Sequence, residues 1–528
     1  MELLGKIWGF LKYHHPVIAK GNYNWDYELF RILPAYLANS GKAERDKILI
    51  KWIDKFGSIQ ICKDCKETAS NAFLKPDHSW INNNLDDRLK QKLFYIYHNR
   101  IQGDQFYIRH FQGVGNPEFL GENSYLYMPY PDAGFRLLAL YRYWNMIQYF
   151  FPYKHLTDKQ WSGTLKEYIP LFITAKNELE YELAAVKIIG EIQDSHANLW
   201  GGSDKMNQWK GTFYPPVHVR FIEDKLVVDE YNNDELKKEA GLRIGDIITH
   251  INGKTIEELL KDLKSYYPAS NEAARMRDIS RDILRSNVNS IHIKYISEDK
   301  NIEKELKLYN VNLNSRYRND IGKSFKLLDD NIGYITLKDI RKDDIEPIKA
   351  TFKNTKGIII DIRNYPKTFV PYLLGSYFVS SSSMPYFIPS SSTPFVKFTI
   401  GNTDNPGEFT FTETKTIPKA KDAYTGKLIV IVNELTQSQA EFTAMAFRAG
   451  ANTTIIGSTT AGADGNFSTI ILPGGLKTGI SGIGVYYPNG KETQRVGIVP
   501  DIIVKPTIEG IKKGKDELIE KAIELIKG

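Results

Sequence analysis

The sequence predicts a multidomain α/β protein with a helical N-terminal region, a smaller β-rich module and an α/β core. Three observations support this class. The chain has 528 residues, enough for several buried cores. Aromatic-rich helical patterns fill its first part, and short β-branched runs alternate with helical patterns after about residue 330. We expect four units, at residues 1–135, 136–210, 211–312 and 313–528.

The composition excludes several classes of protein. Hydrophobic residues make up 42% and charged residues 25%, as in soluble globular proteins. A net charge of +6 gives no strong field for nucleic acid, and no dense basic block points to lipid. No apolar run reaches the roughly 18 residues that a transmembrane helix needs. No charged-then-apolar leader opens the chain, so we expect a mature form, an engineered form or a cytosolic protein.

An internal repeat occupies the helical region. "WGFLKYHHP" begins at Trp8, and "WNMIQYFFP" begins 144 − 8 = 136 positions later. At this spacing Trp8, Tyr13, Pro16, Trp25 and Pro34 recur as Trp144, Tyr149, Pro152, Trp161 and Pro170. Both copies continue into a helical pattern, so we predict a duplicated helical unit with aromatic core packing. The second copy ends differently, in "EIQDSHANLW", residues 191–200.

The cysteines are Cys62 and Cys65, in "ICKDCK". A single CxxC is half of a zinc site, a redox pair or a short disulfide. There is no second CxxC, and His78 is the only nearby histidine. We expect a structural role, a disulfide if the protein is exported.

Residues 211–310 form the β-rich module. The strands "LVVDEY" and "SIHIKYI" flank a helix, a glycine turn, a strand, an "NG" turn and a second helix. The stretch "AGLRIGDIITHINGKTI" resembles a PDZ domain. Such domains add a peptide as an extra strand and often hold its terminal carboxylate on backbone amides. No glycine-rich carboxylate loop is evident near "TFYPPVHVRF", so the resemblance implies the fold and leaves peptide capture open.

The α/β core is predicted from four apolar runs and the helices between them. "NIGYITL", "KGIIIDI", "KLIVIV" and "NTTIIG" are typical of buried parallel strands. "QAEFTAMAFRAG" and the terminal "DELIEKAIELIKG" are helical patterns. The serine-rich segment 378–395 is interpreted as a loop over the site or as a surface excursion.

Ser438 stands between a predicted strand and a predicted helix, in "VNELTQSQAEFTAMAF". With Glu441 it has the spacing of a capping box, which is an ordinary helix start. The carboxyl end of a parallel strand is also where open α/β sheets bind their ligands. A helix N-terminus there offers backbone N–H groups to a developing oxyanion, and Gln439 is the natural donor.

The order of these modules, with "IIIDIRN", "N-x-x-T-x-S-x-A-E" and "GIVPDI", resembles the S41 family of serine peptidases. This family contains the tail-specific, or C-terminal-processing, proteases and the tricorn core protease. The resemblance covers about residues 180–510 and implies a ClpP/crotonase-like catalytic core. It also implies a peptide or protein substrate, no metal or organic cofactor, and an exported bacterial protein, periplasmic or at the cell surface. Ser438 matches the family nucleophile.

One departure from the tail-specific pattern bears on the identity of the general base. The position of the tail-specific lysine is Ala463 here, whereas "QDSHANL" matches the Ser-His pair of the tricorn-like branch. The resemblance therefore implies His196 as general base, held by Ser195. Imidazole suits this role because its pKa lies near neutrality. Asp194 is a rival as the orienting carboxylate.

Another departure concerns the group that orients the base. The tricorn-like pattern places a glutamate three residues before the glycine of "GV-x-PD", and "KETQRVGIVPD" has Gln494 there. Gln494 would orient the imidazole by neutral hydrogen bonding, which stabilises an imidazolium less than a carboxylate does. Glu492 lies two residues earlier and would serve if the register shifted by two.

The family sequence "DLR-x-N-x-GG", which contributes to the oxyanion hole, is replaced here by "DIRNYPKT". Pro366 has no N–H to donate, so Tyr365 or Lys367 would join Gln439 as the second backbone donor. Asp361 and Arg363 are expected to pair structurally.

These observations predict a serine peptidase with Ser438 as nucleophile and His196 as general base. One alternative is a catalytically decayed S41-fold protein that binds a peptide or an apolar ligand. Another is a hydrolase of esters or other acyl groups, although the usual G-x-S-x-G motif is absent.

Overall fold

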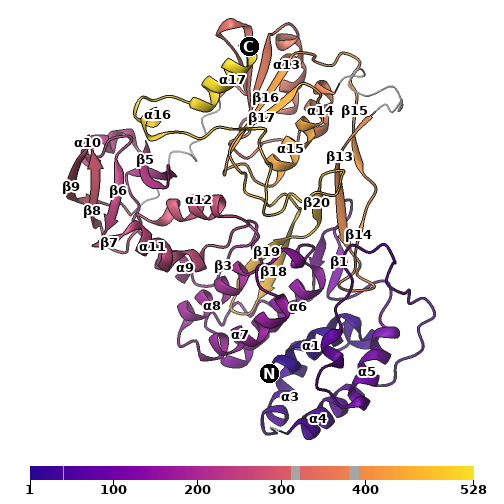
Figure 1. Ribbon diagram of the computed structural model, residues 1–528. Helices are drawn as coiled ribbons and strands as arrows, with labels where there is room; N and C mark the ends of the chain where they lie inside the picture. The colour runs from indigo at the N-terminus through magenta and orange to yellow at the C-terminus, as the bar shows by residue number, and fades with distance from the viewer. Residues whose placement is uncertain (40, 311–321, 380–391) are drawn as a thin grey trace.

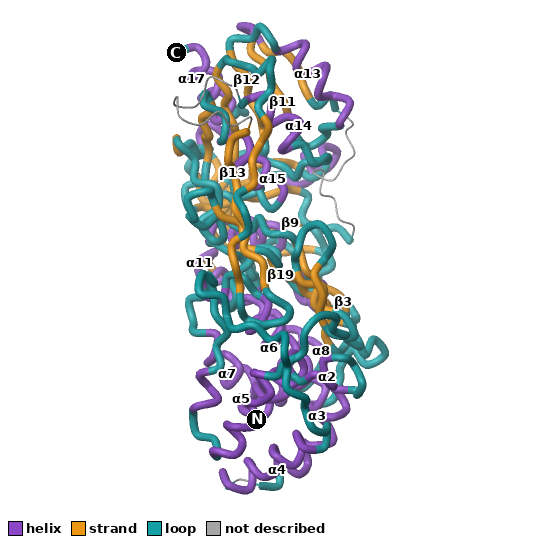
Figure 2. Tube along the Cα trace, turned by 90° about the vertical axis from the view of Figure 1, so that its right-hand side faces the viewer, coloured by secondary structure: helices purple, strands orange, loops and turns teal. Residues whose placement is uncertain are grey.

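The computed structural model describes residues 1–39, 41–310, 322–379 and 392–528. The helical region lies at one end of an elongated molecule, the α/β core lies at the other, and the β-rich module projects beside the middle (Figures 1 and 2). Most of the serine-rich segment 378–395 lies outside the described residues. Within them, no helix combines the length and the apolar character needed to cross a membrane.

The helical region repeats its elements as well as its sequence. Its first copy contains α1 (Glu2–His14), α2 (Pro16–Ala19), α3 (Trp25–Leu37), α4 (Lys42–Asp54) and α5 (Asp87–His98). Its second copy contains α6 (Ala133–Phe150), α7 (Trp161–Thr174) and α8 (Glu178–Gly190). Both ends of α8 lie 136 positions after those of α4 (178 − 42 and 190 − 54). The predicted duplicated helical unit is confirmed, and the boundary predicted at 135/136 falls inside α6.

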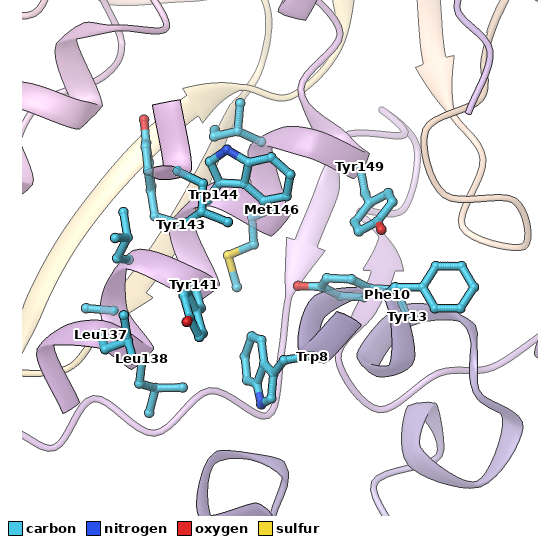
Figure 3. Close-up of a cluster of buried hydrophobic side chains, with 14 of the residues drawn as sticks. Trp8, Phe10, Tyr13, Leu137, Leu138, Tyr141, Tyr143, Trp144, Met146 and Tyr149 are labelled. Atoms are coloured by element: carbon cyan, nitrogen blue, oxygen red, sulfur yellow. The ribbon is translucent and has the colours of Figure 1, made fainter. Parts of the chain in front are cut away.

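The repeated tryptophans form the same pair in both copies. The Trp8 indole N–H donates to the Trp25 carbonyl at 3.1 Å, and Trp25 returns the bond at 3.0 Å. Trp144 and Trp161 exchange the same two bonds, both at 3.1 Å. These bonds let the indoles be buried without an unpaired N–H. Aromatic side chains of α1 and α6 then meet in one core, as predicted (Figure 3).

Charged side chains are also buried in this helical core. Lys12 and Arg142 are fully buried, and both form ion pairs with Glu122, the Arg142–Glu122 distance being 2.8 Å. Arg142 also pairs with Asp26 at 2.5 Å. Glu122 is thus a shared partner of two buried cations, and its removal would leave the charge of Lys12 uncompensated and Arg142 with Asp26 alone.

The two cysteines form a disulfide, so of the three alternatives for the CxxC the short disulfide is the one found. The Cys62 N–H donates to Asn99 Oδ1 at 2.8 Å, which fastens the disulfide loop to the end of α5.

The β-rich module is an antiparallel sheet in the order β4-β5-β6-β8-β9. Its elements are β4 (Val217–Ile222), β5 (Lys225–Tyr231), α10 (Lys237–Ala240), β6 (Ile247–Ile251), β7 (Lys254–Thr255), α11 (Ile256–Leu263), α12 (Glu272–Asp282), β8 (Ser290–Ser297) and β9 (Lys300–Lys307). Asn252 and Gly253 both have positive φ in the turn between β6 and β7, as the predicted "NG" turn requires. β4 is an edge strand, and α12 packs against it.

The α/β core is built on a six-stranded sheet in the order β10-β11-β12-β16-β17-β21. The strands are β10 (Phe325–Leu328), β11 (Ile332–Thr336), β12 (Gly357–Asp361), β16 (Lys427–Val432), β17 (Thr453–Gly457) and β21 (Ile502–Ile503). The four predicted strands are β11, β12, β16 and β17, and they pair in parallel. Both faces are buried, Ile358 and Ile360 in one core and Ile359 in another, which explains the continuous apolar runs.

Helices cover both faces of this sheet. α13 (Ile345–Phe352), α14 (Pro371–Gly375) and α15 (Gln439–Arg448) pack on one face, and α17 (Glu517–Lys527) packs on the other. An outlying sheet of β13 (Ser392–Gly401), β14 (Phe409–Phe411), β15 (Lys415–Pro418) and β20 (Gly484–Tyr486) extends toward the helical region (Figure 1).

A three-stranded sheet joins the core to the helical region. Its order is β18-β19-β3, with β18 (Phe467–Leu472), β19 (Leu476–Ser481) and β3 (Trp200–Gly201). Ile470, Leu472, Leu476 and Ile480 on one face are buried in the helical core. The pairing of β3 with β19 carries the segment after α8 to the α/β core.

Candidate active site

Three loops meet at the carboxyl ends of β12, β16 and β17. The Thr436 hydroxyl, in the loop after β16, donates to the Ile362 carbonyl after β12 at 2.8 Å. The Ala461 N–H, after β17, donates to the Thr436 carbonyl at 3.0 Å. Thr436 therefore ties the loops together two residues before Ser438, at the edge where parallel α/β sheets bind ligands.

Ser438 is the N-cap of α15, but its backbone is not that of an ordinary cap. Its φ and ψ are 58° and −122°, whereas the N-cap Thr255 of α11 has −67° and 158°. The Ser438 N–H donates to the Ala463 carbonyl at 2.9 Å and to Glu441 Oε2 at 3.1 Å. The Glu441 half of the predicted capping box is present, whereas the Ser438 side chain makes no cap hydrogen bond. A cap also does not need a positive φ, which costs about 1–3 kcal/mol outside glycine. Ser438 is thus a cap on a strained strand-to-helix turn.

Glu441 holds the loop after β17 against Ser438. Its carboxylate is buried and accepts the N–H groups of Gly462 at 2.8 Å and Ala463 at 3.0 Å. It also accepts the Thr460 hydroxyl. Burial raises the pKa of Glu441, and these hydrogen bonds act in the opposite direction. Ala463, which stands where tail-specific members have their lysine, is buried in this contact.

The loop after α8 reaches the same place from the helical region. Gln437 Nε2 donates to the Ser195 carbonyl at 3.1 Å. The residue before Ser438 therefore contacts the residue before His196, although 242 positions separate them. The structure brings the two predicted catalytic residues into one neighbourhood.

Ser195 fastens this loop and does not hold the imidazole as predicted. Its hydroxyl donates to the Ala461 carbonyl at 2.9 Å and accepts the Ser270 N–H at 2.9 Å. The Ser195 N–H in turn donates to Ser270 Oγ at 2.8 Å. With these partners the Ser195 hydroxyl is engaged by the backbone of neighbouring loops.

The side chain of His196 is held by Ser481 and Asp194. His196 Nδ1 lies 2.8 Å from Ser481 Oγ, and the Ser481 hydroxyl donates to Asp194 Oδ1 at 3.1 Å. A hydroxyl has one proton, and this one points to Asp194. Nδ1 must therefore carry a proton and donate it to Ser481, which leaves the lone pair on Nε2.

Asp194 is well placed to fix this arrangement. It is fully buried and also accepts the backbone N–H groups of Ser481 at 2.6 Å and His196 at 3.0 Å. Its carboxylate lies 3.8 Å from His196 Nδ1. Burial lowers the pKa of His196 below its ordinary value of 6.5, and the charge of Asp194 raises it in part. The imidazole is consequently neutral at neutral pH, with a basic Nε2.

The two groups predicted to orient the base have other partners. Gln494 is buried, and its Nε2 lies 3.4 Å from Ser270 Oγ, on the far side of the Ser195 loop; no hydrogen bond joins it to His196, both residues being described. Glu492 accepts a hydrogen bond from His155 Nε2 at 2.6 Å. Two other residues lie next to Nδ1 of the imidazole in their place. Asp194 was expected only as a rival, and Ser481 was not suggested by the sequence.

The predicted oxyanion donors differ in availability. Gln439 is the first residue of α15, where backbone N–H groups lack partners within the helix. The Lys367 N–H donates to the Leu337 carbonyl at 3.1 Å, so the prediction of Lys367 as a donor is corrected and Tyr365 is left as the second donor.

Asp361 and Arg363 pair at 2.7 Å, as expected. In the described part of the chain, no three His, Cys, Asp or Glu side chains are placed to share a metal ion.

Comparisons with known proteins agree with this architecture. The family model of peptidase family S41 matches residues 331–504. The solved structure of mature CPAF has 14% sequence identity and a TM-score of 0.57, and the match covers 75% of this chain and 98% of that one. The structure of mature CPAF complexed with lactacystin has 13% sequence identity and a TM-score of 0.56, and the match covers 75% of this chain and 98% of that one.

A more distant structure is the photosystem II D1 C-terminal processing protease. Its identity is 15%, its TM-score is 0.41, and the match covers 72% of this chain and 98% of that one. No curated protein sequence matches the chain. Residues 331–504 are therefore similar to peptidase family S41, and the chain as a whole has a multidomain α/β fold like that of mature CPAF.

Proposed function

We propose that the protein is a serine peptidase in which Ser438 is the nucleophile and His196 the general base. One observation carries the proposal: the Asp194–Ser481–His196 hydrogen-bond chain leaves the imidazole lone pair on Nε2. The Gln437–Ser195 hydrogen bond holds the loop of His196 against the loop of Ser438. The strained φ of Ser438 is a second support, because such strain clusters at reactive sites. The similarity of residues 331–504 to peptidase family S41 supports peptide or protein substrates.

The mechanism follows from the positions of the protons. Ser438 Oγ attacks the scissile carbonyl while His196 Nε2 takes its proton, since a serine hydroxyl is a weak nucleophile without a base. The imidazolium keeps its proton on Nδ1 and donates it to the Ser481 hydroxyl. The buried charge of Asp194 stabilises the imidazolium. His196 then gives the Nε2 proton to the leaving amine, and a water molecule hydrolyses the acyl-enzyme. The N–H groups of Gln439 and Tyr365 bind the oxyanion.

Labelling with a fluorophosphonate, followed by peptide mapping, tests this assignment. We expect modification at Ser438 in the native chain, none in Ser438→Ala, and weak modification in His196→Ala. Thr255→Ala is the matched control, because Thr255 and Glu258 form an ordinary capping box on α11. Labelling of Thr255→Ala should equal that of the native chain. Lactacystin, which is bound in one matched CPAF structure, is a second probe.

The absence of labelling in folded protein would contradict the proposal. The catalytically decayed alternative, a binding protein on the same fold, would then be favoured. A label on another serine would leave the protein a hydrolase and refute Ser438 as its nucleophile.

We also propose that the module at residues 211–310 is PDZ-like and accepts an extended peptide along the free edge of β4. A cleft of about 400 Å³ lies between β4 and α12 and is bounded by the loop that leads to Ser438. Arg277 of α12 donates to the Glu434 carbonyl at 2.8 Å and to Gln437 Oε1 at 2.9 Å. A peptide in this cleft would therefore lie next to the catalytic loop.

The cleft is better suited to an internal segment than to a terminal carboxylate. The N–H groups of Phe213 and Tyr214, before β4, donate to the carbonyls of Ser286 and Tyr309. We expect peptides with free and amidated C-termini to bind Ser438→Ala equally, and Met276→Glu, in the cleft, to weaken both. Fluorescence anisotropy measures this, and a strong requirement for the free carboxylate would contradict the proposal.

Export is the third part of the proposal. The Cys62–Cys65 disulfide supports it, because disulfides persist in oxidising compartments. Fractionation of the native host, with thiol labelling before and after reduction, tests it; a cytosolic protein with free thiols would contradict it.

A further inference from the structure

We infer that the open face of the β18-β19-β3 sheet is the subsite for the residue that follows the scissile bond, and that Phe467 and Trp200 select an aromatic side chain there. The inference rests on the proposed function. Because His196 delivers a proton to the leaving amine, the residue that carries this amine must lie beside the imidazole. The features next to the imidazole therefore determine what that residue can be.

The strand register places two aromatic residues on the face that carries Ser481. Phe467 is paired with Ser481 across β18 and β19, and Trp200 of β3 is paired with Lys477 of β19. Alternate residues of a strand share a face, so Ser481, Lys477 and their partners point the same way. The opposite face, which carries Ile470 and Ile480, is buried in the helical core. The aromatic face is thus the open side of a firmly packed sheet.

The two aromatic rings extend outward from His196. The Phe467 ring meets the His196 ring edge-on, with centroids 6.0 Å apart, and the Trp200 ring meets the Phe467 ring in the same way at 5.9 Å. Phe467 is 43% exposed and Trp200 is 45% exposed. Two neighbouring aromatic side chains next to a catalytic base consequently keep a large area open to a ligand.

A glycine beneath Phe467 allows its ring to lie on the sheet. A Cβ built on Gly479 would be 2.0 Å from Cε2 and Cζ of Phe467, closer than any real contact. The ring therefore covers the backbone of Gly479 and has no room to sink further. A substrate side chain can reach only its outer face and the adjoining Trp200 ring.

This surface favours an aromatic residue over a small or charged one. Covering apolar area is worth about 25 cal/mol per Å², and aromatic pairs add about 0.5–1.5 kcal/mol. An acidic residue would lose hydration against the rings, and an exposed ion pair with Lys477 on the same face offsets this by no more than about 1 kcal/mol. We expect phenylalanine after the scissile bond to exceed alanine by about 10–100-fold in kcat/KM, the usual range for an apolar pocket.

Peptides that differ only at this position test the inference. The native chain should prefer phenylalanine, then leucine, alanine and aspartate. Trp200→Ala should bring the phenylalanine-to-alanine ratio of kcat/KM close to one, because it lowers kcat/KM for the phenylalanine peptide far more than for the alanine peptide. Gly479→Ala keeps both aromatic residues but displaces the Phe467 ring, so it should lower the ratio too. Phe111→Ala, which removes a 48% exposed aromatic side chain elsewhere, should keep the native ratio.

Binding to Ser438→Ala separates this inference from the proposed function, because binding needs no catalysis. Calorimetry should show tighter binding of the phenylalanine peptide, lost when Trp200→Ala is added. If the native chain is labelled and cleaves peptides without this preference, or if Trp200→Ala retains it, the subsite is refuted and the peptidase stands. If fluorophosphonate never labels the chain, the peptidase proposal is refuted. The assignment of the open face of the β18-β19-β3 sheet to the leaving-group residue is then refuted too, even if a peptide binds there.

Discussion

Replacing Ser481 by alanine tests the hydrogen-bond chain on which the mechanism depends. Ser481 is the last residue of β19, and its hydroxyl is the bridge between Asp194 and His196 Nδ1. Alanine removes this bridge and little else, because the Ser481 N–H still binds Asp194 and still holds the strand end. The Asp194 carboxylate stays 3.8 Å from Nδ1, too far for a direct hydrogen bond without movement.

The size of the effect follows from the charge that forms on the imidazole. A hydrogen bond to a charged group contributes about 1.5–3 kcal/mol, and about 1.4 kcal/mol of transition-state energy is tenfold in rate. We therefore expect Ser481→Ala to lower kcat by about 10–150-fold. Asp194→Asn should lower kcat further, because it removes the charge and replaces one of the two acceptor oxygens with an N–H donor.

The pH profile separates the two variants. Activity requires the neutral imidazole, so kcat/KM falls as the pH drops through the pKa of His196. The charge of Asp194 raises this pKa against burial, and its removal in Asp194→Asn should move the acid limb to lower pH. Ser481→Ala keeps the charge of Asp194 near the imidazole, so the acid limb of its pH profile should shift less than that of Asp194→Asn.

The assay is peptide cleavage at a series of pH values, with circular dichroism to confirm folding. Ser468→Ala is the matched control, since Ser468 is a buried serine on the opposite face of the same sheet and binds Asn116. It should leave kcat and the acid limb unchanged. Near-native kcat in Ser481→Ala would refute the hydrogen-bond chain as the device that orients His196.

Three further predictions concern buried charges. Glu122→Gln should lower the free energy of unfolding by about 3–5 kcal/mol in a denaturant titration, because Lys12 and Arg142 lose their shared partner; a change below 1 kcal/mol would contradict this. Glu441→Gln should weaken fluorophosphonate labelling of Ser438 in protein that remains folded, because Glu441 holds the loop after β17 against Ser438; native labelling would contradict this. Burial lowers the pKa of His15 and His78 to about 4, so as the pH falls the unfolded chain binds protons on these histidines before the folded chain does. Stability should thus be complete above pH 6.5 and fall by up to about 3 kcal/mol per histidine toward pH 4, and a pH-independent thermal midpoint would contradict this.

The parts of the fold that sequence predicts correctly are those with a local or periodic signal. The tryptophan spacing indicates the repeat because each copy must bury two indoles whose N–H groups need acceptors, and the pairing is identical in both copies. The apolar runs predict β11, β12, β16 and β17 because helices cover both faces of their sheet.

The details that sequence did not provide depend on contacts between distant segments. Ser481 lies 285 positions from His196, and the pairing of β3 with β19 brings their two segments together. The use of the Lys367 N–H by Leu337 depends on how the loop after β12 folds back. A motif gives residue types in order, whereas the partner of each N–H is set by the tertiary structure.

The position of the predicted base makes the helical region part of the catalytic unit. The second helical copy departs from the first after α8, and the departing segment carries Asp194, His196 and, at β3, Trp200. The strand β19 receives this segment and supplies Ser481, while its other face is buried among the helices. The predicted base is thus anchored in the helical core and the predicted nucleophile in the α/β core. Loosening the helical core should therefore reduce activity before the α/β sheet unfolds, because the loop of His196 is held against the loop of Ser438 only while both cores are intact.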